Sequence, residues 1–399
     1  MVFVFTGGLY TPAWANGQDD EHLLTGKKLF LHYCSHCHGR EGDGEGFNHE
    51  YLDKEPADLT DEAFISKKKN EQLFNVIQNG GSSVRKSHLM PPFGKTLSEG
   101  EIWALVAYVR HLAEDDSNPV SLNALQNAKR SDKASVRSGE IASFLKWFSS
   151  EGKKPASIER GELLFYKRKS CLACHEIDGE GGRVGPGLFR SVFFYRPEWV
   201  YSWIRNPQAF RPNSKMPDLG LDEKEARDIT AFLYAVNEED EGIPEEWSGY
   251  LSPAGDPEQG KKVFFDLEGK ARCAKCHRAG DQGGTVGPDL SFVGSSRTPH
   301  FLLESILDPK KVITAGFTAV LILTEDKKFI TGLKKSESDE GLDIIDKEGR
   351  ELHISLDKIT KYKTDNISIM PEDFKEVLTE KEIKDVLAFL QTLTVPVPR

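Results

Sequence analysis

Methionine and cysteine are the scarcest informative residues of this chain. Of 399 residues, 6 are cysteine and 4 are methionine, one of which is Met1. No run of 18 or more apolar residues occurs, which argues against a membrane-spanning helix in the body of the chain. Basic residues are also in deficit, 52 against 63 acidic ones, so nucleic acid is not expected as the main partner. The mean hydropathy of −0.47 is typical of a soluble chain, and the length suggests two or three domains.

The N-terminal segment is the longest apolar stretch. Residues 2–15 carry no charge and end in Ala13-Trp14-Ala15, a small-residue cleavage pattern. We interpret residues 1–15 as the remnant of a signal peptide without its basic region, with the mature chain starting near Asn16. A buried N-terminal strand is the alternative. The signal interpretation places the protein in the periplasm or another extracytoplasmic compartment.

All six cysteines fall into three C-x-x-C-H motifs, the attachment signal of c-type haem. In this signal both thiols form thioethers with the porphyrin and the following histidine binds the iron. The sequence therefore predicts three covalently attached haems c. The cysteines are Cys34, Cys37, Cys171, Cys174, Cys273 and Cys276, and the histidines are His38, His175 and His277. A disulfide framework leaves the histidines unexplained, structural zinc would lack a fourth ligand at each site, and a thioredoxin-like pair would not occur in triplicate.

The flanks of the motifs repeat as well. A Gly-x-x-x-Phe pattern precedes each motif, at Gly26, Gly161 and Gly260, and a helix with an Ala-aromatic-aliphatic step follows each one, at 107–109, 231–233 and 388–390. Each later helix begins with a capping box, formed by Ser98 with Glu101, Asp222 with Glu225, and Thr379 with Glu382. The glycine is expected to let the last helix approach the first, with the aromatic side chains packed at the crossing.

Each repeat resembles a class I cytochrome c domain. The resemblance implies a mainly α fold of three tandem domains, at residues 21–116, 151–245 and 246–399, with a helical linker at 117–150. The third resembles the haem-binding domain of large planctomycete-type proteins, which has a similar insertion. Alternating patterns at about 314–366 predict a small antiparallel β insertion there, either a cover for the haem edge, a docking site or a tolerated surface elaboration.

In such domains a methionine before the last helix is the distal iron ligand. Met90, Met216 and Met370 all occur there, each followed by proline, although His88 is a rival to Met90. A proline carbonyl normally orients the proximal histidine. Pro186 and Pro288 lie 11 residues beyond their histidines, whereas the first domain lacks such a proline, and Pro56 is its candidate.

The resemblance implies an electron carrier rather than an enzyme. The predicted function is electron relay through three His/Met haems between unidentified redox partner proteins, with peripheral association with a membrane-bound complex left open. Three alternatives also remain open: the electron-accepting cytochrome subunit of a dehydrogenase or nitrogen-cycle oxidoreductase, a haem peroxidase, and a haem filament or scaffold. No cluster of catalytic acids, bases or nucleophiles stands out in the sequence.

Overall fold

The computed structural model describes residues 17–52, 54–120, 138–188, 195–237, 244–314, 317–337, 341–346, 348–363 and 367–394. The predicted signal remnant and most of the first half of the predicted linker lie outside these residues. The chain divides into two compact units, Met1–Leu188 with Tyr201–Phe232, and Phe189–Val200 with Leu233–Arg399. The division into three domains remains a prediction, so we call the three predicted domains the first, second and third repeats. None of the described helices is both long and apolar enough to span a membrane.

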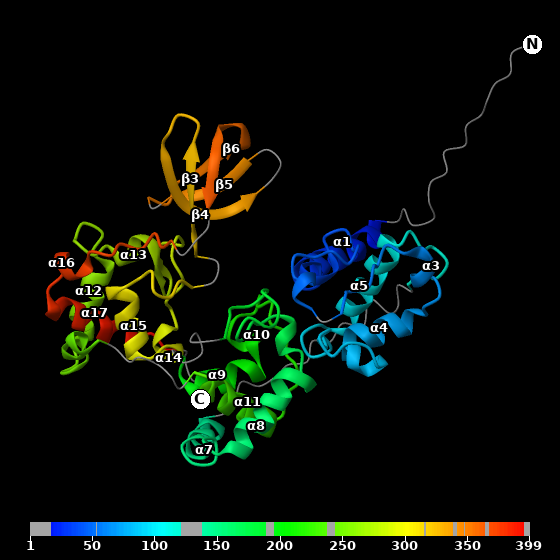
Figure 1. Ribbon diagram of the computed structural model, residues 1–399, viewed down its shortest axis with the longest axis horizontal. Coiled ribbons are helices and arrows are strands. Elements are labelled where there is room, and N and C mark those ends of the chain that lie inside the picture. Colours follow the sequence, from blue (N-terminus) through cyan, green and yellow to red (C-terminus); the bar gives the residue numbers. More distant parts are fainter. Residues whose placement is uncertain are drawn as a thin grey trace, which may run out of the picture. The chain divides into compact units, whose positions relative to one another are not determined.

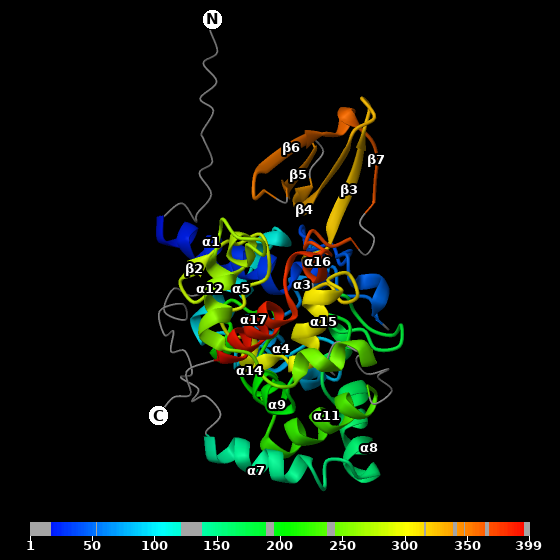
Figure 2. The same cartoon turned by 90° about the vertical axis from the view of Figure 1, so that its left-hand side faces the viewer.

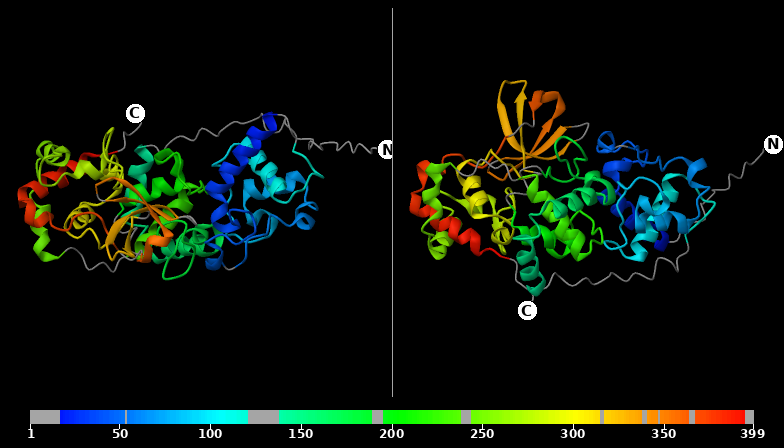
Figure 3. Two further views of the ribbon diagram at one scale, coloured as in Figure 1. Left: turned by 90° about the horizontal axis from the view of Figure 1, so that it is seen from above. Right: turned by 60° about the horizontal axis from the view of Figure 1, so that its bottom comes forward.

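The first repeat is helical and lies within the first compact unit. Its helix α1 runs into the first C-x-x-C-H motif, and α5 ends the repeat; both are visible in the left-hand view of Figure 3. Its elements are α1 (Gly17–Tyr33), α2 (Ser35–His38), η1 (His49–Tyr51), α3 (Glu62–Ile65), α4 (Asn70–Asn79), η2 (Gly81–Val84) and α5 (Glu99–Leu112).

The second repeat follows the same plan after one additional helix. Its elements are α7 (Ser138–Phe148), α8 (Pro155–Leu163), η3 (Leu164–Arg168), η4 (Cys171–Ala173), α9 (Pro197–Arg205), α10 (Pro207–Phe210) and α11 (Glu223–Ala235). Helix α7 occupies the end of the predicted linker. Its Phe144 is fully buried and stacks on Tyr201 with ring centroids 4.4 Å apart, and its Glu140 pairs with Arg205. These contacts attach α7 to α9 within the first compact unit.

The third repeat combines helices with a sheet. Its helical elements are η5 (Glu245–Leu251), α12 (Pro257–Phe265), α13 (Cys273–Cys276), α14 (Val293–Ser296), α15 (Pro299–Leu307), α16 (Phe374–Val377) and α17 (Glu380–Thr392), with a short hairpin of β1 (Arg278–Ala279) and β2 (Gln282–Gly283). Helices α12 and α17 lie side by side in Figure 1. The largest core cluster joins these two helices to α15 through Phe264, Phe389 and Leu303.

The same helix crossing occurs in all three repeats, as the sequence predicts. At each crossing glycine, an added Cβ would collide with a backbone carbonyl oxygen of the last helix. The collisions are Gly26 with Ala104 at 2.2 Å, Gly161 with Asp228 at 2.0 Å, and Gly260 with Asp385 at 1.8 Å. Aromatic rings pack beside each glycine, with centroids 5.3 Å apart for Phe30–Tyr108, 5.5 Å for Phe165–Phe232 and 5.4 Å for Phe264–Phe389. The three predicted capping boxes are also present.

The predicted β insertion forms a five-stranded antiparallel sheet, seen edge-on with its strands labelled in Figure 2. Its strands are β3 (Ala319–Thr324), β4 (Phe329–Glu337), β5 (Gly341–Asp346), β6 (Glu351–Ser355) and β7 (Ile359–Lys363), with η6 (Leu356–Lys358) before β7. The strand order is β6-β5-β4-β3-β7. Four strands match the predicted meander, whereas β7 returns to pair with β3 and was not predicted. The amide of Ala319 donates to the carbonyl of Ile367 at 2.8 Å, so the insertion leaves and rejoins the repeat at neighbouring points.

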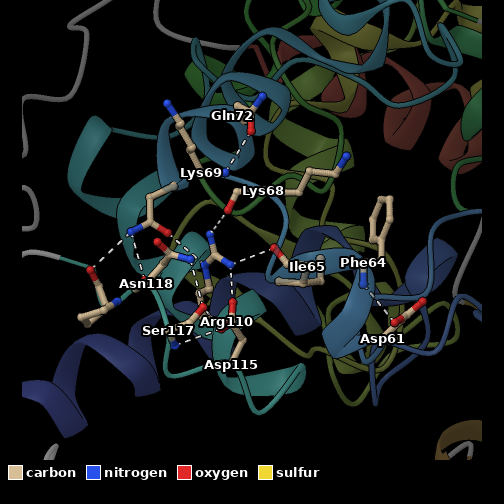
Figure 4. Close-up of polar contacts among 12 residues, drawn as sticks. Asp61, Phe64, Ile65, Lys68, Lys69, Gln72, Arg110, Asp115, Ser117 and Asn118 are labelled. Carbon is tan, nitrogen blue, oxygen red and sulfur yellow. Dashed lines mark hydrogen bonds and ion pairs between the residues drawn. The ribbon is translucent and has the colours of Figure 1, made fainter.

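A buried arginine ties α5 to residues 65–70 of the first repeat (Figure 4). Arg110 of α5 is 4% exposed and forms an ion pair with the buried Asp115. Its guanidinium also donates to the carbonyls of Ile65 and Lys68 and, at 2.9 Å, to Oδ1 of Asn70. The last three bonds hold the chain from the end of α3 to the start of α4 against α5, because their acceptors are Ile65, Lys68 and Asn70.

Candidate haem-binding sites

The three predicted proximal histidines have the same hydrogen bond in common. In each ring Nδ1 lies within hydrogen-bonding distance of a backbone carbonyl oxygen: Ala57 at 3.1 Å for His38, Pro186 at 2.8 Å for His175, and Pro288 at 2.9 Å for His277. Such a bond places the ring proton on Nδ1 and leaves Nε2 as the nitrogen that can bind a metal.

Burial keeps these imidazoles neutral. Desolvation is the larger effect and lowers the pKa of each of the three histidines, while the hydrogen bond to the backbone carbonyl opposes it. A neutral imidazole with its proton on Nδ1 is the form that ligates iron.

In the second and third repeats the carbonyls that orient the histidine rings belong to Pro186 and Pro288. In the first repeat the candidate Pro56 was wrong. In the first repeat the carbonyl belongs to Ala57, the next residue along the chain. The carbonyl oxygen of Pro56 lies instead near Gly44, where a Cβ would be 2.9 Å from it. Any residue can supply a backbone carbonyl, so a search for proline could not find this one.

Glycines that the sequence analysis did not single out close the loops of the second and third repeats. A Cβ at Gly185 would lie 2.5 Å from Cε1 of His175, and one at Gly287 would lie 2.7 Å from Cε1 of His277. Only glycine lets the chain pass this close to the face of the ring. The sequence does contain a pattern that marks these two glycines, because Gly-Gly-x-Val-Gly-Pro occurs twice, at residues 181–186 and 283–288.

The six cysteines are partly buried, and their sulfur atoms lie in low-dielectric surroundings. Burial raises the pKa of Cys34, Cys171 and Cys174 to about 12 and that of Cys273 to about 11, and it raises the pKa of Cys37 and Cys276 as well. Such surroundings suit an uncharged sulfur. A thioether to haem is uncharged, so the donor set of two such sulfurs and a neutral imidazole fits covalently attached haem.

Two of the three predicted methionine ligands, Met216 and Met370, lie in loops that share a serine turn. The amide of Met216 donates to Oγ of Ser214 at 3.1 Å, and that of Met370 donates to Oγ of Ser368 at 3.2 Å. The indole Nε1 of Trp203 also lies 3.0 Å from Sδ of Met216 and donates to it. The Ser-x-Met pattern was a further missed signal.

The structure brings one methionine into the core cluster of its own motif. Met370 and Cys273 both pack against the cluster around Phe264. In the first repeat the carbonyl of Met90 accepts a hydrogen bond from the amide of Gly81 at 3.0 Å. The rival His88 has a buried Nε2 with no hydrogen-bond partner among the described residues, so the structure does not remove it from consideration.

The base of the sheet packs against the third motif. A cluster of Val286, Ala319 and Leu333 has Cys276 and Ile345 against it, which joins the attachment loop to β3, β4 and β5. The right-hand view of Figure 3 shows the sheet projecting from the helices of this repeat. The insertion therefore covers the second cysteine of the motif at one end and extends away from it at the other.

A comparison with protein families points in the same direction. Residues 21–109 and 156–233 match the family described as cytochrome C oxidase, cbb3-type, subunit III. These segments cover the first repeat and most of the second, less than half of the chain. Among solved structures, a chain of the reducing HAO-like protein complex of Kuenenia stuttgartiensis is 17% identical, with 53% of this chain and 96% of that chain covered and a TM-score of 0.18. The two matched segments are therefore similar to c-type cytochrome domains, which bind haem c covalently and transfer electrons.

Proposed function

We propose that the protein is an extracytoplasmic electron carrier with three covalently bound haems, each held by one histidine and one methionine. The observation that carries this proposal is the threefold repetition of one arrangement: two partly buried cysteines, and a histidine whose Nδ1 is held by a backbone carbonyl. A single arrangement of this kind could be incidental to packing, whereas three at equivalent positions indicate one repeated task.

Each group of residues has a separate role in holding the haems. The carbonyls of Ala57, Pro186 and Pro288 fix the proximal rings, and the thiols form the covalent attachments. We assign Met90, Met216 and Met370 as the distal ligands. Bound haem c supplies a one-electron Fe(III)/Fe(II) couple. Because the imidazole and the thioether would both ligate the iron, no open position would be left for substrate, and a thioether ligand would favour a high reduction potential.

Mass spectrometry of the purified full-length protein provides the first test. Three covalent haems are expected, and fewer would refute at least one site. The serine at position 252 is not part of any motif, so Ser252→Ala serves as a variant that should leave the haem count unchanged.

Variants of the distal ligands provide the second test. Met216→Ala should remove the far-red Met–iron charge-transfer band of one haem in three, and Met90→Ala and Met370→Ala should each remove another third. An unchanged band in Met90→Ala together with a loss in His88→Ala would reassign the first haem to His88. A high-spin ferric EPR signal in the unmodified protein would contradict the carrier function and favour a peroxidase.

A further inference from the structure

Asn48 connects the first and second C-x-x-C-H motifs inside the first compact unit. Its side chain is fully buried. Nδ2 donates to the carbonyl of Ala173 at 2.8 Å and lies 3.4 Å from Sγ of Cys37, while Oδ1 accepts a hydrogen bond from the amide of Arg183 at 2.7 Å. One side chain thus contacts both cysteine motifs, because Ala173 directly precedes Cys174.

The contacts fix the orientation of the amide. Reversing it would place Oδ1 against the carbonyl of Ala173 and Nδ2 against the N–H of Arg183, which is unfavourable at both ends. A buried amide is costly unless its polar atoms are satisfied, and here every partner of the side chain belongs to one of the two motif loops. Local turn formation does not explain it, since Ala173 and Arg183 are 125 and 135 residues away in the sequence.

Other contacts bring the same two repeats together. Oγ of Ser170, the residue before Cys171, donates to the carbonyl of His88 at 2.7 Å. The attachment loop of the second repeat therefore also contacts the loop that precedes Met90 in the first repeat.

We propose that Asn48 is a positioning residue that joins the first two haem sites into a coupled pair, within which an electron passes directly from one haem to the other. This inference rests on the proposed function. In the step, one iron is oxidised from Fe(II) to Fe(III) as the other is reduced from Fe(III) to Fe(II). Tunnelling rates fall exponentially with the separation of the two centres, so bringing Cys37 and Cys174 together favours this route.

Soret circular dichroism of the full-length protein tests the pair, because two haems held close together in fixed orientation give a bisignate exciton signal. The unmodified protein should show this signal. Asn48→Ala removes both donor contacts and the acceptor for Arg183, so the signal should be lost while the count of three covalent haems is kept. The haem-to-haem exchange rate, measured by flash reduction, should fall in the same variant.

Thr96→Val is the matched control. It deletes the 2.9 Å hydrogen bond from the amide of Asp218 to Oγ1 of Thr96, which joins the same two repeats away from the cysteine motifs, and it should keep the signal. A protein with three haems and no bisignate signal would overturn the pair even if Asn48→Ala failed to fold, and so would an unchanged signal in Asn48→Ala. Fewer than three haems would instead refute the proposed function.

Discussion

The first repeat reaches the same histidine geometry as the other two by a different route. In the second and third repeats the orienting carbonyl lies 11 residues beyond the histidine, and a glycine passes the ring face. In the first repeat the carbonyl is 19 residues away, at the end of a loop without that glycine-proline sequence. The proximal hydrogen bond is thus compatible with a short glycine-dependent loop or with a longer loop that needs support from elsewhere.

The chain just beyond the longer loop is anchored at the end of α5. Arg110 and Asp115 are both almost fully buried, and the arginine binds the carbonyls of Ile65 and Lys68, which lie 8 and 11 residues after Ala57. Asp115 is held in turn by the amide of Ser117 at 3.0 Å. A long loop has more conformational freedom to lose than a short one, so a buried, fully bonded ion pair is a reasonable anchor for it.

Arg110→Ala should therefore have the largest effect. It leaves the carboxylate of Asp115 buried without its partner, which typically costs about 3–5 kcal/mol. Thermal unfolding should show the loss, and the visible spectrum should show that only the haem of the first repeat is disturbed. Lys154→Ala, which removes an exposed pair with Glu151, should cost about 1 kcal/mol or less. Equal losses for the two variants would contradict the anchoring role.

The same anchor predicts a pH dependence. Burial alone would raise the pKa of Asp115, but hydrogen bonds from Ser117 and Arg110 outweigh it and hold the pKa below its ordinary value. The stabilisation is therefore complete above the unfolded-state pKa of about 3.9 and is lost as the pH falls through the lower folded-state value. Acid unfolding followed by circular dichroism should show this loss in the unmodified protein, and Asp115→Asn should flatten it.

A glycine variant tests the short loops. Gly185→Ala would place a methyl group 2.5 Å from the ring of His175, and overpacking of this kind typically costs about 1–3 kcal/mol. Gly187→Ala, two residues further on, meets its nearest atom at an ordinary 3.8 Å and should cost little. The reduction potential of the second haem should shift only in Gly185→Ala. If the reduction potential shifted in both variants, the cause would be the stiffness of the loop and not the contact with the ring of His175.

The correct predictions from the sequence depend on residue types that occur at the same place in every repeat. The cysteine motifs, the crossing glycines and the capping boxes have side-chain signatures at short spacing, and the structure shows the crossings and the caps. The strand pattern of the insertion was also predicted, except for β7, whose Ile359-Thr360-Lys361-Tyr362-Lys363 sequence is largely polar and exposed.

The residues that the sequence did not predict were missed for a shared physical reason. The carbonyl of Ala57 carries no sequence signature, since every residue has a carbonyl. The link from Asn48 to the second motif depends on partners more than 120 residues away, and a single sequence does not reveal such contacts. The support from Arg110 likewise depends on a fold in which α5 passes the loop between α3 and α4. Long-range contacts thus complete sites whose local parts were predictable.

The smallest expected effect concerns the methionine loops. Ser214→Ala and Ser368→Ala each remove the acceptor for the amide of the methionine two residues later, a loss of about 0.5–1.5 kcal/mol. In the first repeat Ser87 accepts instead from Leu89 at 3.2 Å, so Ser87→Ala should disturb Met90 less directly. Titration of the far-red band to alkaline pH should therefore show earlier loss of the methionine ligand in the first two variants than in the third. The opposite order would mean that the proline after each methionine, and not the serine before it, holds the loop.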